Sequence, residues 1–137
     1  MSAVCGIEIK SKTATLVVLD GTRDDFTLRK SKPLKIELSD SSSQESIKTF
    51  SDEINNFFLN EKVEKVVIKE GVSKGKFTSG SPVFKIETII QMSGVEVNLL
   101  KPQILKTFLK DEEFELNDND LKKYQQVAFE VAYYGLK

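Results

Sequence analysis

Three extended segments follow one another at the start of this chain, and helices then alternate with strands. Residues 3–10 and 13–19 are rich in apolar and β-branched side chains, and only Ser11 and Lys12 separate them, which predicts an antiparallel hairpin. A third extended segment covers residues 26–38, where Pro33 can break it. Closely joined strands pair antiparallel and strands separated by helices pair parallel, so this order predicts one mixed α/β sheet with flanking helices.

The rest of the chain shows helical and strand patterns in turn. Ser42 followed by Glu45 matches a capping box, and the apolar residues from Ile47 to Phe58 recur at helical spacing, which predicts a helix ending near Asn60. The other predicted elements are a strand over 63–69, a helix with Pro82 in its first turn that ends near Gly94, a strand over 95–100, a short helix from Pro102, and a last helix that buries Leu121, Tyr124, Ala128 and Val131.

The composition fits one folded domain over residues 1–137, with 39% hydrophobic and 30% charged residues. No apolar run approaches the roughly 20 residues that a membrane helix needs, and the N-terminus lacks the pattern of a secretory signal. The one cysteine, Cys5, lies in the first apolar strand, where a buried inert thiol is expected. We therefore expect a cytoplasmic protein without a membrane partner.

The absence of histidine limits the chemistry that this chain can perform. It excludes Ser-His-Asp and Cys-His catalysis and most zinc sites, which leaves carboxylates, lysines, hydroxyls or a hard metal held by oxygen. The net charge is −1, so no global basic field attracts nucleic acid. Binding to nucleic acid would require a local basic patch.

Two glutamates occupy strand positions that usually carry apolar side chains. Glu8 lies within the first strand, on the same face as Val4 and Gly6, and Glu70 closes the strand that begins at Val63. Adjacent strands lie about 4.8 Å apart, so two carboxylates at similar height can share a cation, and oxygen-only ligation favours Mg²⁺ or Mn²⁺. The alternative is a structural ion pair whose partner is Lys10, Lys12 or Lys69, and the pattern does not separate the two.

Two basic segments are further candidates for binding. The loop over residues 71–81 fails the phosphate-binding P-loop pattern, but Lys74, Lys76 and the N–H groups near Ser81 can contact a phosphate backbone. The alternative is a solvated loop without a ligand. The second segment carries Arg29, Lys30, Lys32 and Lys35, which on an edge strand more often prevent aggregation than bind a partner.

The first strand, Val4-Cys5-Gly6-Ile7-Glu8-Ile9-Lys10-Ser11, resembles that of the ribonuclease H-like superfamily, nearest to the RuvC-like Holliday-junction resolvases. The resemblance implies a five-stranded mixed sheet of order 3-2-1-4-5 flanked by helices. It also implies that Glu8 and Glu70 are catalytic metal ligands and that Ser81 opens the helix after the fourth strand. Resolvases place aspartates at the start of the last helix, where this chain has Gln125 or Gln126. Asp118 and Asp120 near that start, or Glu130 further along, can substitute.

The chain as a whole resembles an uncharacterised bacterial family, domain of unknown function 3010. That resemblance rests on four segments: Cys5-Gly6-Ile7-Glu8, Val67-Ile68-Lys69-Glu70, Lys74-Gly75-Lys76-Phe77 and Ala132-Tyr133-Tyr134-Gly135-Leu136. We expect a nucleic-acid-associated protein with a Mg-dependent phosphodiesterase site at Glu8 and Glu70. The alternative is a non-catalytic ribonuclease H-like binding domain with an incomplete metal site.

Overall fold

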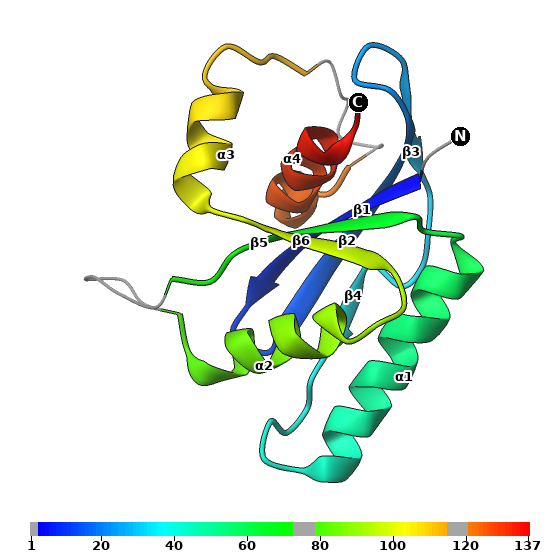
Figure 1. Cartoon of the computed structure of the whole chain (residues 1–137), viewed down its shortest axis with the longest axis vertical. Coiled ribbons are helices and arrows are strands. Elements are labelled where there is room, and N and C mark those ends of the chain that lie inside the picture. The colour runs from blue at the N-terminus through cyan, green and yellow to red at the C-terminus, as the bar shows by residue number, and fades with distance from the viewer. Residues whose placement is uncertain (1–2, 73–78, 115–120) are drawn as a thin grey trace.

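A computed structural model of the chain describes residues 3–72, 79–114 and 121–137, and in these residues a mixed sheet lies between two pairs of helices (Figure 1). The elements are β1 (Ala3–Lys10), β2 (Thr13–Gly21), β3 (Phe26–Arg29), β4 (Lys35–Glu37), α1 (Gln44–Asn60), β5 (Lys65–Lys69), α2 (Ser81–Gln91), β6 (Glu96–Leu100), α3 (Pro102–Leu109), the 3-10 turn η1 (Lys123–Gln125) and α4 (Gln126–Gly135).

The predicted strand order is confirmed. The strands run β3-β2-β1-β5-β6, with β1 antiparallel to β2 and parallel to β5. The third predicted strand is divided into β3 and β4, both of which pair with β2, so the described part of the sheet has six strands instead of five. Pro33 lies between them and has no N–H to donate to a ladder, which accounts for the break.

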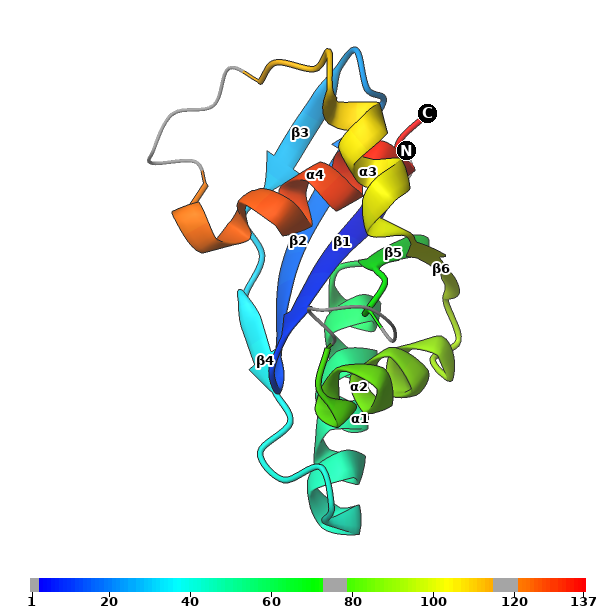
Figure 2. The ribbon, with the colours of Figure 1, turned by 90° about the vertical axis from the view of Figure 1, so that its left-hand side faces the viewer.

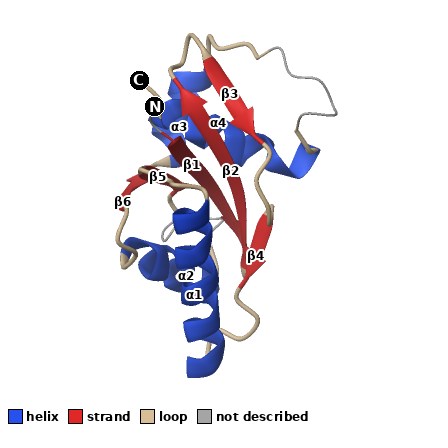
Figure 3. Ribbon diagram, turned by 90° about the vertical axis from the view of Figure 1, so that its right-hand side faces the viewer, coloured by secondary structure: helices blue, strands red, loops and turns tan. Residues whose placement is uncertain are grey.

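Each face of the sheet has its own apolar core (Figures 2 and 3). Helices α1 and α2 cover one face, where Phe50 and Ile54 of α1 pack against Cys5 and Ile7 of β1. Helices α3 and α4 cover the other face, where Phe129 packs with the alternate β1 side chain Val4. Because β1 is buried from both sides, it contributes apolar side chains to both cores, as expected for a central strand.

Local sequence patterns place the helices, with corrections at α1, at α2 and in the last helical segment. Helix α2 ends at Gln91, before the predicted end near Gly94. The N-cap of α1 is Ser43 instead of the predicted Ser42, because the Ser43 hydroxyl accepts the Ser46 N–H at 3.2 Å. In the last helical segment Tyr124 is exposed, whereas Gln125 is buried. The 3-10 turn η1 causes this change, because its three residues per turn shift the buried face relative to a continuous α-helix.

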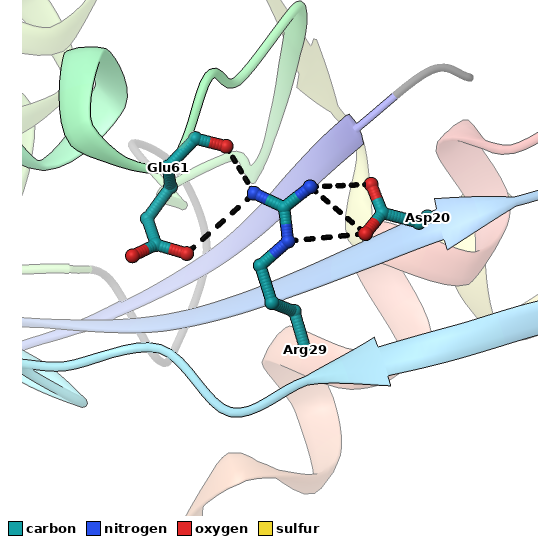
Figure 4. Close-up of polar contacts among 3 residues, drawn as sticks. All are labelled: Asp20, Arg29 and Glu61. Atoms are coloured by element: carbon teal, nitrogen blue, oxygen red, sulfur yellow. Dashed lines mark hydrogen bonds and ion pairs between the residues drawn. The ribbon is translucent and has the colours of Figure 1, made fainter.

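A part-buried arginine ties the sheet to the end of α1 (Figure 4). The Arg29 guanidinium donates to both carboxylate oxygens of Asp20 at 2.6 to 3.0 Å, and it also contacts the carbonyl and the carboxylate of Glu61. Glu61 is the residue that ends α1. Arg29 therefore has a structural role, in contrast to the surface role expected for its segment.

The expectation of a buried thiol is confirmed. Cys5 is fully buried, and burial raises the pKa of its thiol, which suits a packing residue. Across residues 3–72, 79–114 and 121–137, no helix has the length and hydropathy needed to cross a membrane.

Candidate functional site

Glu8 lies in a row of polar side chains that crosses three strands. Strand pairing sets Glu8 opposite Thr15 of β2, and Thr15 opposite Lys35 of β4, so the three side chains share one face of the sheet. This is the α4 face, because a Cβ on Gly6, two residues earlier on β1, would meet Ala128 and Ala132 of α4. Glu8 thus lies on the face that the last helix covers.

A hollow of about 380 Å³ opens at this row, beside the start of α4. It is lined by Glu8, Lys10, Thr13, Thr15, Lys35, Glu37 and Tyr124, and we call it the Glu8 hollow. Glu8 itself is only 7% exposed. The Glu8 backbone belongs to the ladder between β1 and β2, but no hydrogen bond or ion pair joins its side chain to another residue of the described chain.

The lysines expected as ion-pair partners of Glu8 have different positions. Lys10 lines the Glu8 hollow, and Lys12 instead pairs with Glu37 at 3.9 Å. Lys35, which was not among the expected partners, also lines it and lies 4.0 Å above the Tyr124 ring. The hollow therefore combines a buried carboxylate with lysines of the kind that bind phosphate.

Glu70 has different neighbours from Glu8. It follows β5, donates its backbone N–H to the Leu100 carbonyl at 2.8 Å, and does not line the Glu8 hollow. The parallel register sets Ile7 beside Ile68, so Glu8 is level with Lys69 and Glu70 comes one residue later. Because successive strand residues point to opposite faces, this register turns Glu70 towards the face covered by α2.

Glu87 of α2 is a buried carboxylate that the pattern-based reasoning missed. It is 5% exposed, and its Oε2 accepts the Gly71 N–H at 2.6 Å. Burial raises the pKa of Glu87, the hydrogen bond from Gly71 opposes that change, and the nearby Glu70 charge adds to it. The signal was present in the sequence, because Glu87 lies four residues after Val83, on the apolar face of the helix.

Glu87→Gln should make the protein's stability less dependent on pH. The folded-state pKa lies above the unfolded-state value, so between the two the unfolded chain binds fewer protons and the free energy of unfolding falls as pH rises. Glutamine keeps an acceptor for Gly71 without this loss. In urea unfolding from about pH 4 to about pH 8, the free energy of unfolding of the variant should rise relative to that of the wild type as pH rises. A parallel course for both proteins would contradict the assignment, and exposed Glu53→Gln provides the control.

The start of the last helix offers amides where resolvase-like chemistry would use carboxylates. The side chain of buried Gln125 accepts the Lys122 N–H at 3.0 Å, and exposed Gln126 donates to Glu130 at 3.3 Å. Asp118 and Asp120 lie outside the described residues, as do Lys74 and Lys76.

The remaining predicted phosphate contact, Ser81, is exposed at the first position of α2.

The predicted metal ligands do not form a cluster. The part of the chain that the structure describes contains no group of three or more acidic, histidine or cysteine residues able to hold a metal ion. The Glu8 hollow has two carboxylates, Glu8 and the exposed Glu37, beside two lysines, and Glu37 is paired with Lys12. The described donors therefore do not fit a two-metal centre, which usually needs several carboxylates.

This arrangement of sheet and helices defines the chain as a protein of the ribonuclease H-like fold. It is similar to RuvC of T. thermophilus in complex with Holliday junction substrate (13% identity, TM-score 0.65, covering 97% of this chain and 91% of that one). A second Thermus thermophilus RuvC structure matches with 14% identity and a TM-score of 0.68, covering 96% and 91% of the two chains. The fowlpox virus Holliday junction resolvase matches with 15% identity and a TM-score of 0.56, covering 97% of each.

A family model assigns the chain more specifically than the fold does. The family described as "Protein of unknown function (DUF3010)" matches residues 2–135, so the chain belongs to the DUF3010 family, and the predicted resemblance is confirmed. No curated protein matches the sequence. At 13% to 15% identity, the likeness to resolvases establishes the fold alone.

Proposed function

We propose that this chain is a nucleic-acid-associated protein whose site is the Glu8 hollow, and that Glu8 takes part in Mg²⁺- or Mn²⁺-dependent phosphodiester hydrolysis. The observation that carries the proposal is a buried carboxylate at 7% exposure, without a hydrogen-bond or ion-pair partner in the described chain, in a hollow that solvent reaches. The Glu8 carboxylate oxygens are not among the fully buried, unpartnered polar atoms of the described residues, so solvent or a ligand can reach them from the hollow.

The chemistry of the lining supports a phosphate ligand accompanied by one hard cation. The Glu8 carboxylate and the Thr13 and Thr15 hydroxyls are oxygen donors of the kind that Mg²⁺ prefers. Lys10 and Lys35 carry positive charge at the same hollow and suit phosphate oxygens. A bound cation would supply Lewis acidity towards a phosphodiester. The structural likeness to a RuvC that was solved in complex with a Holliday junction substrate supports a nucleic-acid ligand.

The other predicted site residues remain proposals. Glu70 would add a second carboxylate only if it turned from its Glu87 side towards the end of β1. Asp118 and Asp120 are proposed as further metal ligands. Lys74, Lys76 and Ser81 are proposed as contacts to the phosphate backbone.

A second candidate function is a non-catalytic domain that binds nucleic acid through the same hollow. The specific observation in its favour is the pair of lysines beside the buried carboxylate of Glu8, together with Gln125 engaged in capping η1. In this alternative the lysines bind phosphate and Glu8 sets selectivity, without hydrolysis.

Glu8→Gln should reduce cleavage at least about 100-fold if hydrolysis occurs, because a metal ligand would be removed. The assay incubates the protein with branched, duplex and RNA–DNA hybrid substrates in Mn²⁺ or Mg²⁺. Glu53→Gln on α1 is the control, since it changes an exposed carboxylate that does not line the hollow. Cleavage retained by Glu8→Gln would reject the catalytic proposal. Binding without cleavage in the wild type would favour the non-catalytic alternative.

A further inference from the structure

We propose that a second hollow, next to the Glu8 hollow, is a binding site for a phosphate group of a nucleic-acid strand. It has a volume of about 200 Å³ and lies between β2, β3, the connection to β4, and η1. Figure 2 shows the start of α4 beside the β3–β4 connection, where this hollow lies. This inference rests on the proposed function and identifies where the strand continues beyond the Glu8 hollow.

The charged residues that line this second hollow are all positive. Among the described residues that line it, four are basic, namely Arg29, Lys30, Lys32 and Lys122, and none is acidic. Arg29 is already paired with Asp20 and Glu61, so the three lysines supply the charge that a ligand would meet. No ion pair joins these lysines to an acidic residue within residues 3–72, 79–114 and 121–137. A concave surface of this kind concentrates anions locally, although the whole chain carries a net charge of −1.

Neutral polar groups complete the second hollow. Ser31 is 5% exposed and Gln125 is 6% exposed, and both line it. A serine hydroxyl and a glutamine amide can each donate a hydrogen bond to a phosphate oxygen. The side-chain Oε1 of Gln125 accepts the Lys122 N–H, which fixes the Gln125 amide at η1.

The two hollows are adjacent, which suggests one continuous ligand. Leu16, Leu34 and Gln125 line the second hollow, and their sequence neighbours Thr15, Lys35 and Tyr124 line the Glu8 hollow. A strand with one phosphate at the lysine-rich hollow therefore has its next groups near Glu8. This placement predicts that the second hollow adds affinity, whereas the Glu8 hollow contributes any chemistry.

The test compares three probes by NMR: inorganic phosphate, a 5′-mononucleotide and a short single-stranded oligonucleotide. Phosphate should shift the amide signals of Ser31, Lys32 and Lys122, and the double variant Lys32→Gln/Lys122→Gln should bind each probe at least about tenfold more weakly. For the oligonucleotide, the slope of log affinity against log salt should fall by about 1.4, at about 0.7 per lost contact on a single strand. Lys106→Gln, an exposed change on α3, is the control and should leave all three unchanged.

The outcomes separate this inference from the proposed function. If phosphate shifts none of these signals, or if the double variant binds all three probes as the wild type does, the second site is wrong. Loss of phosphate binding with unchanged oligonucleotide binding would assign the hollow to a free anion and reject a nucleic-acid strand there. Glu8→Gln should leave phosphate binding at the second hollow intact, so failure of catalysis alone does not affect this result.

Discussion

Gly6→Ala should destabilise the protein by at least about 3 kcal/mol, which is a large part of the stability of a domain of this size. A Cβ at this position would lie 2.1 Å from the Ala128 carbonyl oxygen and 2.3 Å from the Ala132 nitrogen. Both are backbone atoms of α4, so no side-chain rotation relieves the overlap and the helix must move away from β1. Urea unfolding followed by circular dichroism measures the effect.

Gly94→Ala is the matched control for this change. A Cβ on Gly94 meets no heavy atom within 4 Å, so the substitution should be neutral or stabilise by about 0.4 to 1 kcal/mol. Equal unfolding midpoints for the two variants would show that the contact between β1 and α4 is looser than described. The Glu8 hollow is lined by β1, β2, β4 and by Tyr124 of η1, which directly precedes α4, so a displacement of α4 should also alter the hollow.

Arg29→Met should destabilise the protein by about 2 to 3 kcal/mol. The change leaves the Asp20 carboxylate, whose side chain is 14% exposed, without its bidentate partner, and it leaves the end of α1 untied from β3. The estimate lies below that for a fully buried pair, because 30% of the Arg29 side chain is exposed. Urea unfolding at neutral pH measures the difference.

Lys12→Met tests whether the Arg29 effect depends on burial. The Lys12–Glu37 pair is 3.9 Å apart and about half exposed on both sides (49% and 55%), so its loss should cost no more than about 0.5 kcal/mol. A similar cost for both variants would contradict a special role for the Arg29 network. Arg29 also lines the second hollow. If Arg29→Met does not lower the free energy of unfolding, the Arg29 side chain is free to bind a ligand there.

The order of elements was sufficient to predict a mixed sheet, because hairpins pair antiparallel and crossovers pair parallel. The strand order itself was predicted from the resemblance of the first strand to the ribonuclease H-like superfamily. The sequence also predicted the buried face of α1, which repeats at regular helical spacing. Where the periodicity changes, the prediction was wrong. The 3-10 turn η1 exposes Tyr124 and buries Gln125, and nothing in the local pattern marks that change of period.

The candidate site could be predicted only in part, for a related reason. Alternation within β1 fixes the face of Glu8 relative to Gly6, but it says nothing about the face of Glu70 on a different strand. That relation depends on the register between β1 and β5, which is set through a long crossover by the pairing of Ile7 with Ile68. Lys35 lines the Glu8 hollow only because β4 pairs with β2 after the break at Pro33, and strand propensity does not predict that pairing.

The most direct test of the Glu8 hollow as the functional site is paramagnetic broadening by Mn²⁺ in the ¹H–¹⁵N NMR spectrum of the whole chain. At a small fraction of an equivalent of Mn²⁺, the amide signals of Glu8 and Thr15 should weaken first. Glu8→Gln should abolish this effect, and Glu53→Gln, which lies outside the hollow, should preserve it. Broadening confined to other acidic segments such as residues 111–113, or unchanged by Glu8→Gln, would contradict the account.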